Sequence, residues 1–325
     1  MKDVNIIKQL LKQPFEKTDL PIKNKMHGKV RDIYPLGEQQ MLLVVTDRLS
    51  AFDRILGCVP FKGQVLNQLS AWWFENTKDI IANHMLSTPD PNAMLSHRAD
   101  AFQVEVIVRG YITGVTKTAL WYRYELGERD IYGHQFLDGL QKNQKLPEAI
   151  ITPTTKGGVT GHDERLTVEQ VSADGYLDQE TWDIVQKAAL ALFARGQAVA
   201  EKTGLILVDT KYEFGRLPNG EVAVIDEIHT PDSSRFWALD SYEERIKAGQ
   251  EPENYDKEFL RLEYAKLGYR GEGAPPVMPE ELWIKVSQRY MELYERLTGQ
   301  MFEVGEYPVP ERLERNLRIA GIFQE

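Results

Sequence analysis

With 325 residues, 42% of them hydrophobic, the chain is long enough for one large domain or two of ordinary size. Its formal net charge of −10 argues against a dedicated nucleic-acid-binding protein, and its single cysteine, Cys58, excludes an intramolecular disulfide. Because no apolar run approaches membrane-spanning length, we predict a cytoplasmic protein with neither nucleic-acid nor membrane partners.

The first third of the chain is predicted to be rich in β-strands. After a short amphipathic N-terminal helix, GKVRDIYPLGEQQMLLVVT (28–46) predicts a hairpin with strands near 30–34 and 41–46. GQVLNQLSAWWFENT (63–77) has the apolar spacing of a helix, whereas FQVEVIVRGYIT (102–113) alternates as a strand does. We therefore predict that residues 1–110 form a β-rich N-terminal part.

The remainder, residues 111–325, is predicted to mix helices and strands. A long helix is expected between Asp178, a suitable N-cap, and Gly204, a typical stop signal. Two strands follow, LILVDTKYEFG (205–215) and EVAVIDEIH (221–229), joined by RLPNG with its Asn-Gly turn signal. A further helix is predicted over 279–299, so the pattern indicates an α+β fold class.

The strand pair carries a group of carboxylates with one lysine. Alternate residues of a strand share a face, so Asp209, Lys211 and Glu213 are predicted to point the same way. The hairpin then places Asp226 roughly opposite them. Such oxygens suit Mg²⁺ together with phosphate oxygens, although a solvated polar face with a Lys–Asp pair would give the same spacing.

Several loops at the ends of apolar strands are individually ambiguous. HGKVRDIY (27–34) suits either a cover over phosphates or a basic hairpin edge, and it is not a P-loop. Three further segments are compatible with either binding loops or ordinary surface turns. They are TDRLSAFDRILG (46–57), the stretch after Arg109, and the Thr/Gly-rich ITPTTKGGVTGHDE (151–164). HTPDSSRFW (229–237) suits an anion-binding turn or a polar turn held by two aromatic residues.

Taken together, these loops place Arg, Lys, Asp and hydroxyl groups at the ends of several apolar strands. No zinc-ligand spacing or nucleophilic triad accompanies them. The combination favours an enzyme that handles anionic, phosphate-bearing substrates with Mg²⁺.

Seven motifs in this order resemble the phosphoribosylaminoimidazole-succinocarboxamide synthase (SAICAR synthetase) family. They are GKVRDIY, TDRLSAFDRIL, KGQVLNQLSAWWF, VEVIVRGYITG, TPTTK with HDE, LILVDTKYEFG and IDEIHTPDSSRFW. The match runs from about residue 25 to about residue 262, and the tail resembles the longer members. The resemblance implies an α+β fold related to ATP-grasp and kinase-like nucleotide sandwiches, with the N-terminal part covering ATP.

The implied reaction joins the carboxylate of CAIR, an aminoimidazole ribonucleotide, to the amine of L-aspartate, with ATP converted to ADP and phosphate. Positions matching the ATP site are Gly28, Lys29, Arg31, Lys156 and Glu213. Glu213 and Asp226 would hold Mg²⁺. Asp209 and Lys211 would be the catalytic residues beside them. The oligomeric state is left open.

The resemblance also implies a set of substrate-binding positions. They are Ser50, Asp53, Arg109, Asp163, Ser234, Arg235 and Arg261. Ser50 and Asp53 would face the region between CAIR and aspartate, and Asp163 would approach the aspartate. Arg109 would pair with the CAIR phosphate or carboxylate, and Ser234 and Arg235 would grip its phosphate. Arg261 would add positive charge nearby.

One position departs from the family pattern. The family usually has TGS where this chain has TGVTK, so Val115 replaces a serine that contributes to CAIR binding. Losing a hydrogen bond to a charged group typically costs about 1.5–3 kcal/mol unless another donor replaces it. Thr116 or Thr118 is a candidate replacement.

Two other functions are compatible with glycine-loop and carboxylate features. A kinase for a small anionic substrate would release ADP without any need for aspartate. A nucleotide-binding regulatory module would show no turnover. The role of His229 stays open.

Overall fold

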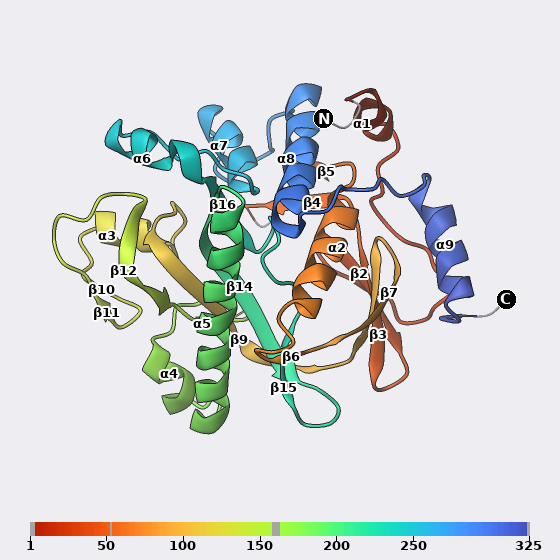
Figure 1. Cartoon of the computed structure of the whole chain (residues 1–325), viewed down its shortest axis with the longest axis horizontal. Coiled ribbons are helices and arrows are strands. Elements are labelled where there is room, and N and C mark those ends of the chain that lie inside the picture. Colours follow the sequence, from red (N-terminus) through yellow and green to blue (C-terminus); the bar gives the residue numbers. More distant parts are fainter. Residues whose placement is uncertain (1–3, 53, 158–162, 324–325) are drawn as a thin grey trace.

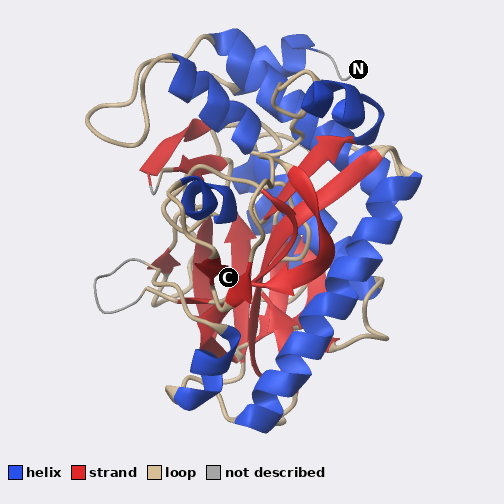
Figure 2. Ribbon diagram, turned by 90° about the vertical axis from the view of Figure 1, so that its left-hand side faces the viewer, coloured by secondary structure: helices blue, strands red, loops and turns tan. Residues whose placement is uncertain are grey.

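The protein is built around two β-sheets with helices packed against them. The computed structural model describes residues 4–52, 54–157 and 163–323 of the chain. Figure 1 shows the two sheets side by side, and in Figure 2 the strands occupy the centre of the molecule with helices around them. This mixture of strands and helices confirms the predicted α+β fold class.

The smaller sheet has five antiparallel strands and contains the predicted N-terminal hairpin, β2 with β3. In spatial order its strands are β1 (Met26–His27), β2 (Arg31–Leu36), β3 (Gln40–Val45), β8 (Ala93–His97) and β7 (Met85–Asp90). The last helix, α9 (Val309–Ile319), packs on this sheet, where Leu313 and Leu317 share a core with Leu42 and Val44. The C-terminal end of the chain therefore covers an N-terminal sheet.

The larger sheet has β14 at its centre. Its main path runs β12 (Gln144–Ile151), β9 (Asp100–Ile112), β14 (Leu205–Arg216), β15 (Val222–Ile225) and β6 (Ala82–Asn83). Two further strands pair with this path, β13 (Thr154–Thr155) with β9 and β16 (Ser234–Ala238) with β14. Separate two-stranded hairpins are β4 (Arg48–Ala51) with β5 (Arg54–Cys58) and β10 (Asp130–Ile131) with β11 (His134–Gln135).

The three long helices predicted from the sequence are confirmed. The helices of the described chain are α1 (Val4–Leu10), α2 (Lys62–Glu75), α3 (Leu120–Glu125), α4 (Val168–Ala173), α5 (Gln179–Lys202), α6 (Leu239–Lys247), α7 (Glu258–Lys266), α8 (Glu280–Thr298) and α9. Asp178 caps α5, since its carboxylate accepts the backbone N–H of Thr181 at 2.8 Å. Gly204 follows the end of α5 with a positive φ of 74°.

The prediction of one continuous strand over 221–229 is wrong. β15 ends at Ile225, because Asp226 and His229 have positive φ angles of 69° and 48° that a strand does not allow. The chain then turns and returns as β16. β15 and β16 lie on the same edge of β14, opposite β9, so half of the supposed turn HTPDSSRFW is a strand.

In the described chain, the strands of the smaller sheet precede those of the larger sheet, with one exception. All strands of the smaller sheet lie before residue 98, whereas β9 already belongs to the larger sheet. The short strand β6 crosses the other way and pairs in parallel with β15. The change of sheet therefore falls near residues 98–100, and α9 returns from the tail to the smaller sheet.

Helix α5 packs on β14 with almost no space at Gly196. A Cβ atom there would lie 2.5 Å from Cε1 of His229 and 2.6 Å from Cδ2 of Leu207. Both neighbours are buried, so neither can move away without disturbing the core. This close approach holds the start of the 226–235 segment against the helix.

We predict that Gly196→Ala destabilises the protein by about 1–3 kcal/mol, because overpacking outweighs the gain of about 1 kcal/mol in helix propensity. Urea denaturation measures this change. Lys187→Ala, on the exposed side of the same helix, is the matched control and should change stability little. A Gly196→Ala protein as stable as the parent would show that the packing is looser than described.

Candidate active site

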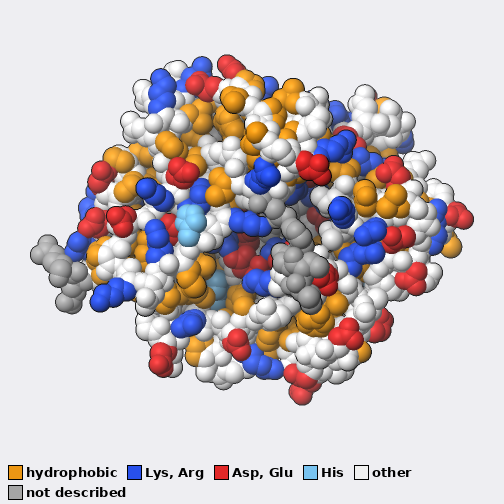
Figure 3. All heavy atoms as spheres, turned by 180° about the vertical axis from the view of Figure 1, so that it is seen from behind, with side chains coloured by type: hydrophobic (Ala, Val, Ile, Leu, Met, Phe, Trp, Pro, Cys, Tyr) orange, Lys and Arg blue, Asp and Glu red, His pale blue; other side chains and the backbone are white. Residues whose placement is uncertain are grey.

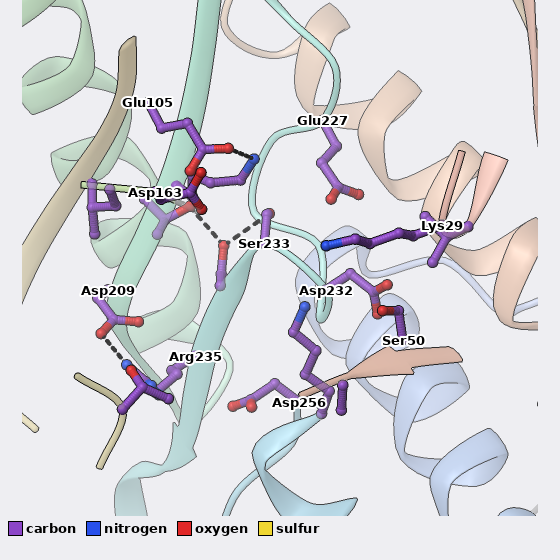
Figure 4. A pocket seen from close by; sticks show the side chains of 18 of the residues that line it. Lys29, Ser50, Glu105, Asp163, Asp209, Glu227, Asp232, Ser233, Arg235 and Asp256 are labelled. Atoms are coloured by element: carbon purple, nitrogen blue, oxygen red, sulfur yellow. Dashed lines mark hydrogen bonds and ion pairs between the residues drawn. The ribbon is translucent and has the colours of Figure 1, made fainter. Parts of the chain in front are cut away.

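A pocket of about 450 Å³ lies where the two sheets and the start of α7 meet. Its walls come from the loop before β2, the strands β4, β9 and β14, and the segment between β15 and β16. Charged side chains of both signs gather around a hollow on one face of the molecule (Figure 3). Figure 4 shows labelled side chains from these segments pointing toward one another.

The pocket brings together most of the residues singled out from the sequence. Its lining includes Lys29, Arg31, Ser50, Arg109, Asp163, Asp209, Lys211, Asp226, Ser234, Arg235 and Arg261. Lys156 and Glu213 lie just outside this lining and form an ion pair with each other. Gly28 directly precedes the lining, and Asp53 lies outside the described residues.

Lys211 forms the centre of a charged cluster on β14. Its Nζ donates to Glu105 Oε1 at 2.9 Å and to Glu213 Oε1 at 2.5 Å. Burial alone would raise the pKa of Glu213, but Lys211 and Lys156 outweigh it and hold that pKa at about 2. Glu105 was missed from the sequence. The available signal was its spacing, because Glu105 lies two positions from Ile107 and four from Arg109 and so shares their face of a buried strand.

Asp209 is held between two arginines from the neighbouring strands. The register of β14 places Asp209 opposite Arg109 on β9 and opposite Arg235 on β16. Asp209 Oδ2 accepts from Nη1 of Arg109 at 3.3 Å and from Nη1 of Arg235 at 2.5 Å. Burial alone would lower the pKa of Arg235. The facing carboxylates, above all Asp209, outweigh burial and raise that pKa above its usual value, so this guanidinium stays charged. Arg235 also lies 3.9 Å from Glu258. Both guanidinium groups line the pocket, where they can bind an incoming anion.

Arg31 connects the hairpin of the smaller sheet to the segment after β15. Its guanidinium forms an ion pair with Asp226 and a second with Glu227 Oε2 at 2.9 Å. Glu213 pairs in register with Ile225, so the two carboxylates predicted to hold a metal lie on adjacent positions across the strand pair. Within the described residues, no three His, Cys, Asp or Glu side chains form a preformed metal cluster.

A set of buried polar residues at the pocket wall was missed from the sequence. Lys62 is fully buried at the start of α2, and its Nζ lies 2.9 Å from Oδ2 of Asp232. Tyr290 on α8 donates its hydroxyl to the other oxygen of Asp232 at 2.9 Å. Burial lowers the pKa of the adjacent Lys257 to about 8, against the opposing attraction of Asp232. The available signal was the presence of Lys62 and Asp232 within two of the motifs shared with the family.

His229 has a packing role. It is fully buried, and its Nε2 lies 2.5 Å from the hydroxyl of Tyr212. Its ring packs edge-on against Trp73 with 4.5 Å between centroids. Burial lowers its pKa to about 3, so the imidazole is neutral at physiological pH. Phe236 and Trp237 are likewise buried, which agrees with the alternative that aromatic residues anchor this segment.

The segment that departs from the family pattern borders the pocket. Val115 is 46% exposed and does not line the pocket, whereas the neighbouring Thr116 does. Of the two hydroxyl candidates, Thr116 is therefore the better placed.

Comparisons with known proteins identify the family of this chain. The family model described as SAICAR synthetase matches residues 24–276. The chain belongs to the SAICAR synthetase family. The phosphoribosylaminoimidazole-succinocarboxamide synthase of Legionella pneumophila (strain Lens) is 50% identical over 305 residues, covering 93% of this chain and 96% of the relative.

Two further members of the SAICAR synthetase family show the same relation. The chloroplastic synthase of Arabidopsis thaliana is 48% identical over 91% of this chain and 72% of its own length. The SAICAR synthase of Saccharomyces cerevisiae, solved in complex with SAICAR, is 32% identical with a TM-score of 0.77, covering 89% of this chain and 100% of that one. The predicted family and its α+β fold are thereby confirmed. Among the described helices, none is long and apolar enough to cross a membrane.

The charged cluster on β14 predicts how acid affects stability. The pKa of Glu213 is about 2 in the folded protein against a usual 4.5, so its ion pairs stabilise the fold above pH 4.5. That stabilisation is lost as the pH falls from about 4.5 to about 2. Glu213→Gln should therefore cost about 2 kcal/mol at pH 7, with the difference from the parent shrinking over this interval.

Urea denaturation at a series of pH values measures the effect. Glu148→Gln, an exposed glutamate on β12, is the control and should show no such trend. A Glu213→Gln difference that does not change between pH 7 and pH 3 would contradict the ion-pair assignment.

Proposed function

We propose that this protein joins the carboxylate of CAIR to the amine of L-aspartate, with ATP converted to ADP and phosphate, in de novo purine biosynthesis. Membership of the SAICAR synthetase family supports an ATP-dependent ligase. The structural observation that carries the proposal is Asp209, shared by Arg109 and Arg235 beside Lys211 in one pocket. This arrangement supplies cations for anionic substrates within an acidic chain.

The chemistry requires activation of the carboxylate. A carboxylate resists attack by an amine because it is negatively charged and its oxygen is a poor leaving group. Transfer of the γ-phosphoryl group of ATP to a CAIR carboxylate oxygen gives an acyl phosphate and ADP. The amine of L-aspartate then attacks the acyl carbon, phosphate leaves with that oxygen, and the amine loses a proton. Cations that offset the crowded negative charge lower the barrier to both steps.

We assign the nucleotide phosphates to the side of the pocket formed by the smaller sheet. Lys29 and Arg31 line this side, and Gly28 lets the loop fold closely over the ligand. Lys156, paired with Glu213, borders the same region. Lys211 and Asp209 both line the pocket and are proposed as the catalytic residues.

The substrate side is assigned to the cations around α7 and β16. Arg235 and Ser234 would hold the CAIR phosphate, supported by Arg109 and Arg261. Ser50 and Asp163 both line the pocket and would face the aspartate region, and Asp53 belongs to the same proposed set. Thr116 would supply the hydroxyl that Val115 lacks.

Mg²⁺ is proposed as the accompanying ion. The donor set fits it, since Mg²⁺ in nucleotide sites is commonly bound by one or two carboxylates plus substrate phosphates. Glu213 and Asp226 would provide the carboxylates, and the ion would neutralise charge between the ATP phosphates. The nearby Arg31, Lys156 and Lys211 balance these carboxylates electrostatically.

The domain division and the cellular location are also part of the proposal. The division into a nucleotide-covering N-terminal part and a larger substrate part is one, with the change of sheet near residue 98 as its structural basis. Cytoplasmic location is the other, and one related synthase is named chloroplastic.

The experiment that tests the function is an ADP-release assay with ATP, Mg²⁺, CAIR and L-aspartate, each omitted in turn. We expect ADP and phosphate only when all four are present, because the acyl phosphate must form and then be attacked. ADP release that does not require aspartate and yields no free phosphate would instead support a kinase. Release of both ADP and phosphate without aspartate would support an ATPase, and no release at all would support a binding module.

We predict that Asp226→Asn raises the Mg²⁺ concentration required for half-maximal rate at least ~10-fold, because an amide is a weaker ligand than a carboxylate. A Mg²⁺ titration of the ADP-release rate measures this. Arg31→Lys is the comparison variant, since it perturbs the ion pair to Asp226 but keeps the carboxylate. An unchanged Mg²⁺ requirement in Asp226→Asn would remove Asp226 from the metal site.

A further inference from the structure

Arg48, at the start of β4, is a buried arginine with an unusual set of partners. Its side chain is 1% exposed and does not line the pocket. Nε donates to the carbonyl oxygen of Lys29 at 3.1 Å, and Nη2 donates to that of Gly28 at 3.0 Å. Nη1 donates to the carbonyl of Glu16. One guanidinium thus holds the backbone of two separate segments.

The loop before β2 is fixed along its whole inner edge. The next carbonyl, that of Val30, accepts the backbone N–H of Thr46 at 3.0 Å and its hydroxyl at 2.9 Å. Three consecutive carbonyl oxygens, from 28 to 30, therefore point toward Thr46 and Arg48. The loop is closed by the Gly28 N–H, which donates to the Arg31 carbonyl at 2.8 Å.

The outer edge of the same loop faces the pocket. Lys29, Val30 and Arg31 all line it, and Figure 4 shows the Lys29 side chain extending into the space. The inner edge, with the bound carbonyls of residues 28–30, and the outer edge, which lines the pocket with residues 29–31, share Lys29 and Val30. The position of the pocket wall is therefore set from behind by hydrogen bonds to the backbone.

Asp32 fixes the orientation of Arg48. Its Oδ1 lies 2.9 Å from Nη2 of Arg48, and its Oδ2 accepts the backbone N–H and the hydroxyl of Thr18 at 2.9 and 2.6 Å. Burial raises the pKa of Asp32, but the hydrogen bonds from Thr18 and Arg48 outweigh it and lower that pKa below its usual value. Alternation along β2 sends Arg31 to the pocket and Asp32 to the interior.

We propose that Arg48 is a positioning residue for binding the nucleotide polyphosphate: it holds the 28–31 loop in the conformation in which Lys29 and Arg31 face the phosphates. This inference rests on the proposed ATP-dependent function. Ordering this loop in advance removes an entropy cost from ligand binding. Burying a guanidinium costs free energy unless its N–H groups are hydrogen-bonded, and here backbone carbonyls accept them. An apolar side chain at this position would leave those carbonyls unpaired.

A purely stabilising arginine in the same part of the fold provides a matched comparison. Arg312 on α9 is 3% exposed and is bound by Asp90 on the smaller sheet, with contacts at 3.0 Å from Nε and Nη2. It does not line the pocket and makes no contact with the 28–31 loop in the described structure. Substituting it perturbs the same sheet without releasing the loop.

The test measures the dissociation constant of MgATP by calorimetry in the absence of CAIR, for Arg48→Met, Arg48→Lys and Arg312→Met. We expect Arg48→Met to weaken MgATP binding about 10–100-fold, and Arg48→Lys to weaken it less, since lysine replaces only part of the hydrogen bonding. Arg312→Met should lower the midpoint of urea denaturation. Its dissociation constant for MgATP should stay within twofold of that of the parent. In turnover, KM for ATP should rise in Arg48→Met while KM for CAIR stays within twofold.

The outcomes separate the inference from the function on which it rests. A parent protein that does not bind MgATP would contradict the proposed function itself. A parent that binds MgATP together with Arg48 variants that bind it equally well would overturn the positioning role. Equal losses of affinity in Arg48→Met and Arg312→Met would also overturn it, because general destabilisation would then explain both. If Arg48→Met does not fold, Arg48→Lys and Arg312→Met decide on the same criteria.

Discussion

The structure of the pocket depends on the register of one strand, β14, against its two neighbours. That register places the Asp209 carboxylate between Arg109 of β9 and Arg235 of β16. These buried charges offset one another, and removing the Asp209 carboxylate would leave both guanidinium groups without their shared partner. Lys211 and Glu213 follow Asp209 on the same face of β14. The 226–233 segment joins β15 to β16 on the edge of β14 that faces away from β9.

This pairing explains how a chain with a formal net charge of −10 can serve anionic substrates. The cations of the pocket include Arg31, Arg109, Lys211 and Arg235, and each faces at least one carboxylate. The paired groups keep their charges in a partly buried site, because the facing charges offset the cost of leaving water. Incoming phosphates and carboxylates then compete with the protein's own carboxylates for the same cations, which favours ligands that bring several negative charges.

The sequence predicted those parts of the site that depend on local periodicity. Alternation along β14 placed Asp209, Lys211 and Glu213 on one face, and the ordered motifs identified the family before any geometry was available. Local pattern does not report backbone angles, so the left-handed conformation of Asp226 and the early end of β15 were missed. It also does not report contacts between distant segments. The ion pair between Lys62 and Asp232 and the packing of α9 on the smaller sheet both join segments that are far apart in the sequence.

The pocket is proposed to activate a carboxylate by phosphorylation before the amine attacks. The most direct measurement is turnover of CAIR labelled with ¹⁸O in its carboxylate, followed by mass spectrometry of the phosphate released. Transfer through an acyl phosphate predicts one ¹⁸O atom in each phosphate, because the carboxylate oxygen leaves with the phosphoryl group. Phosphate that carries no ¹⁸O while SAICAR is formed would contradict the account.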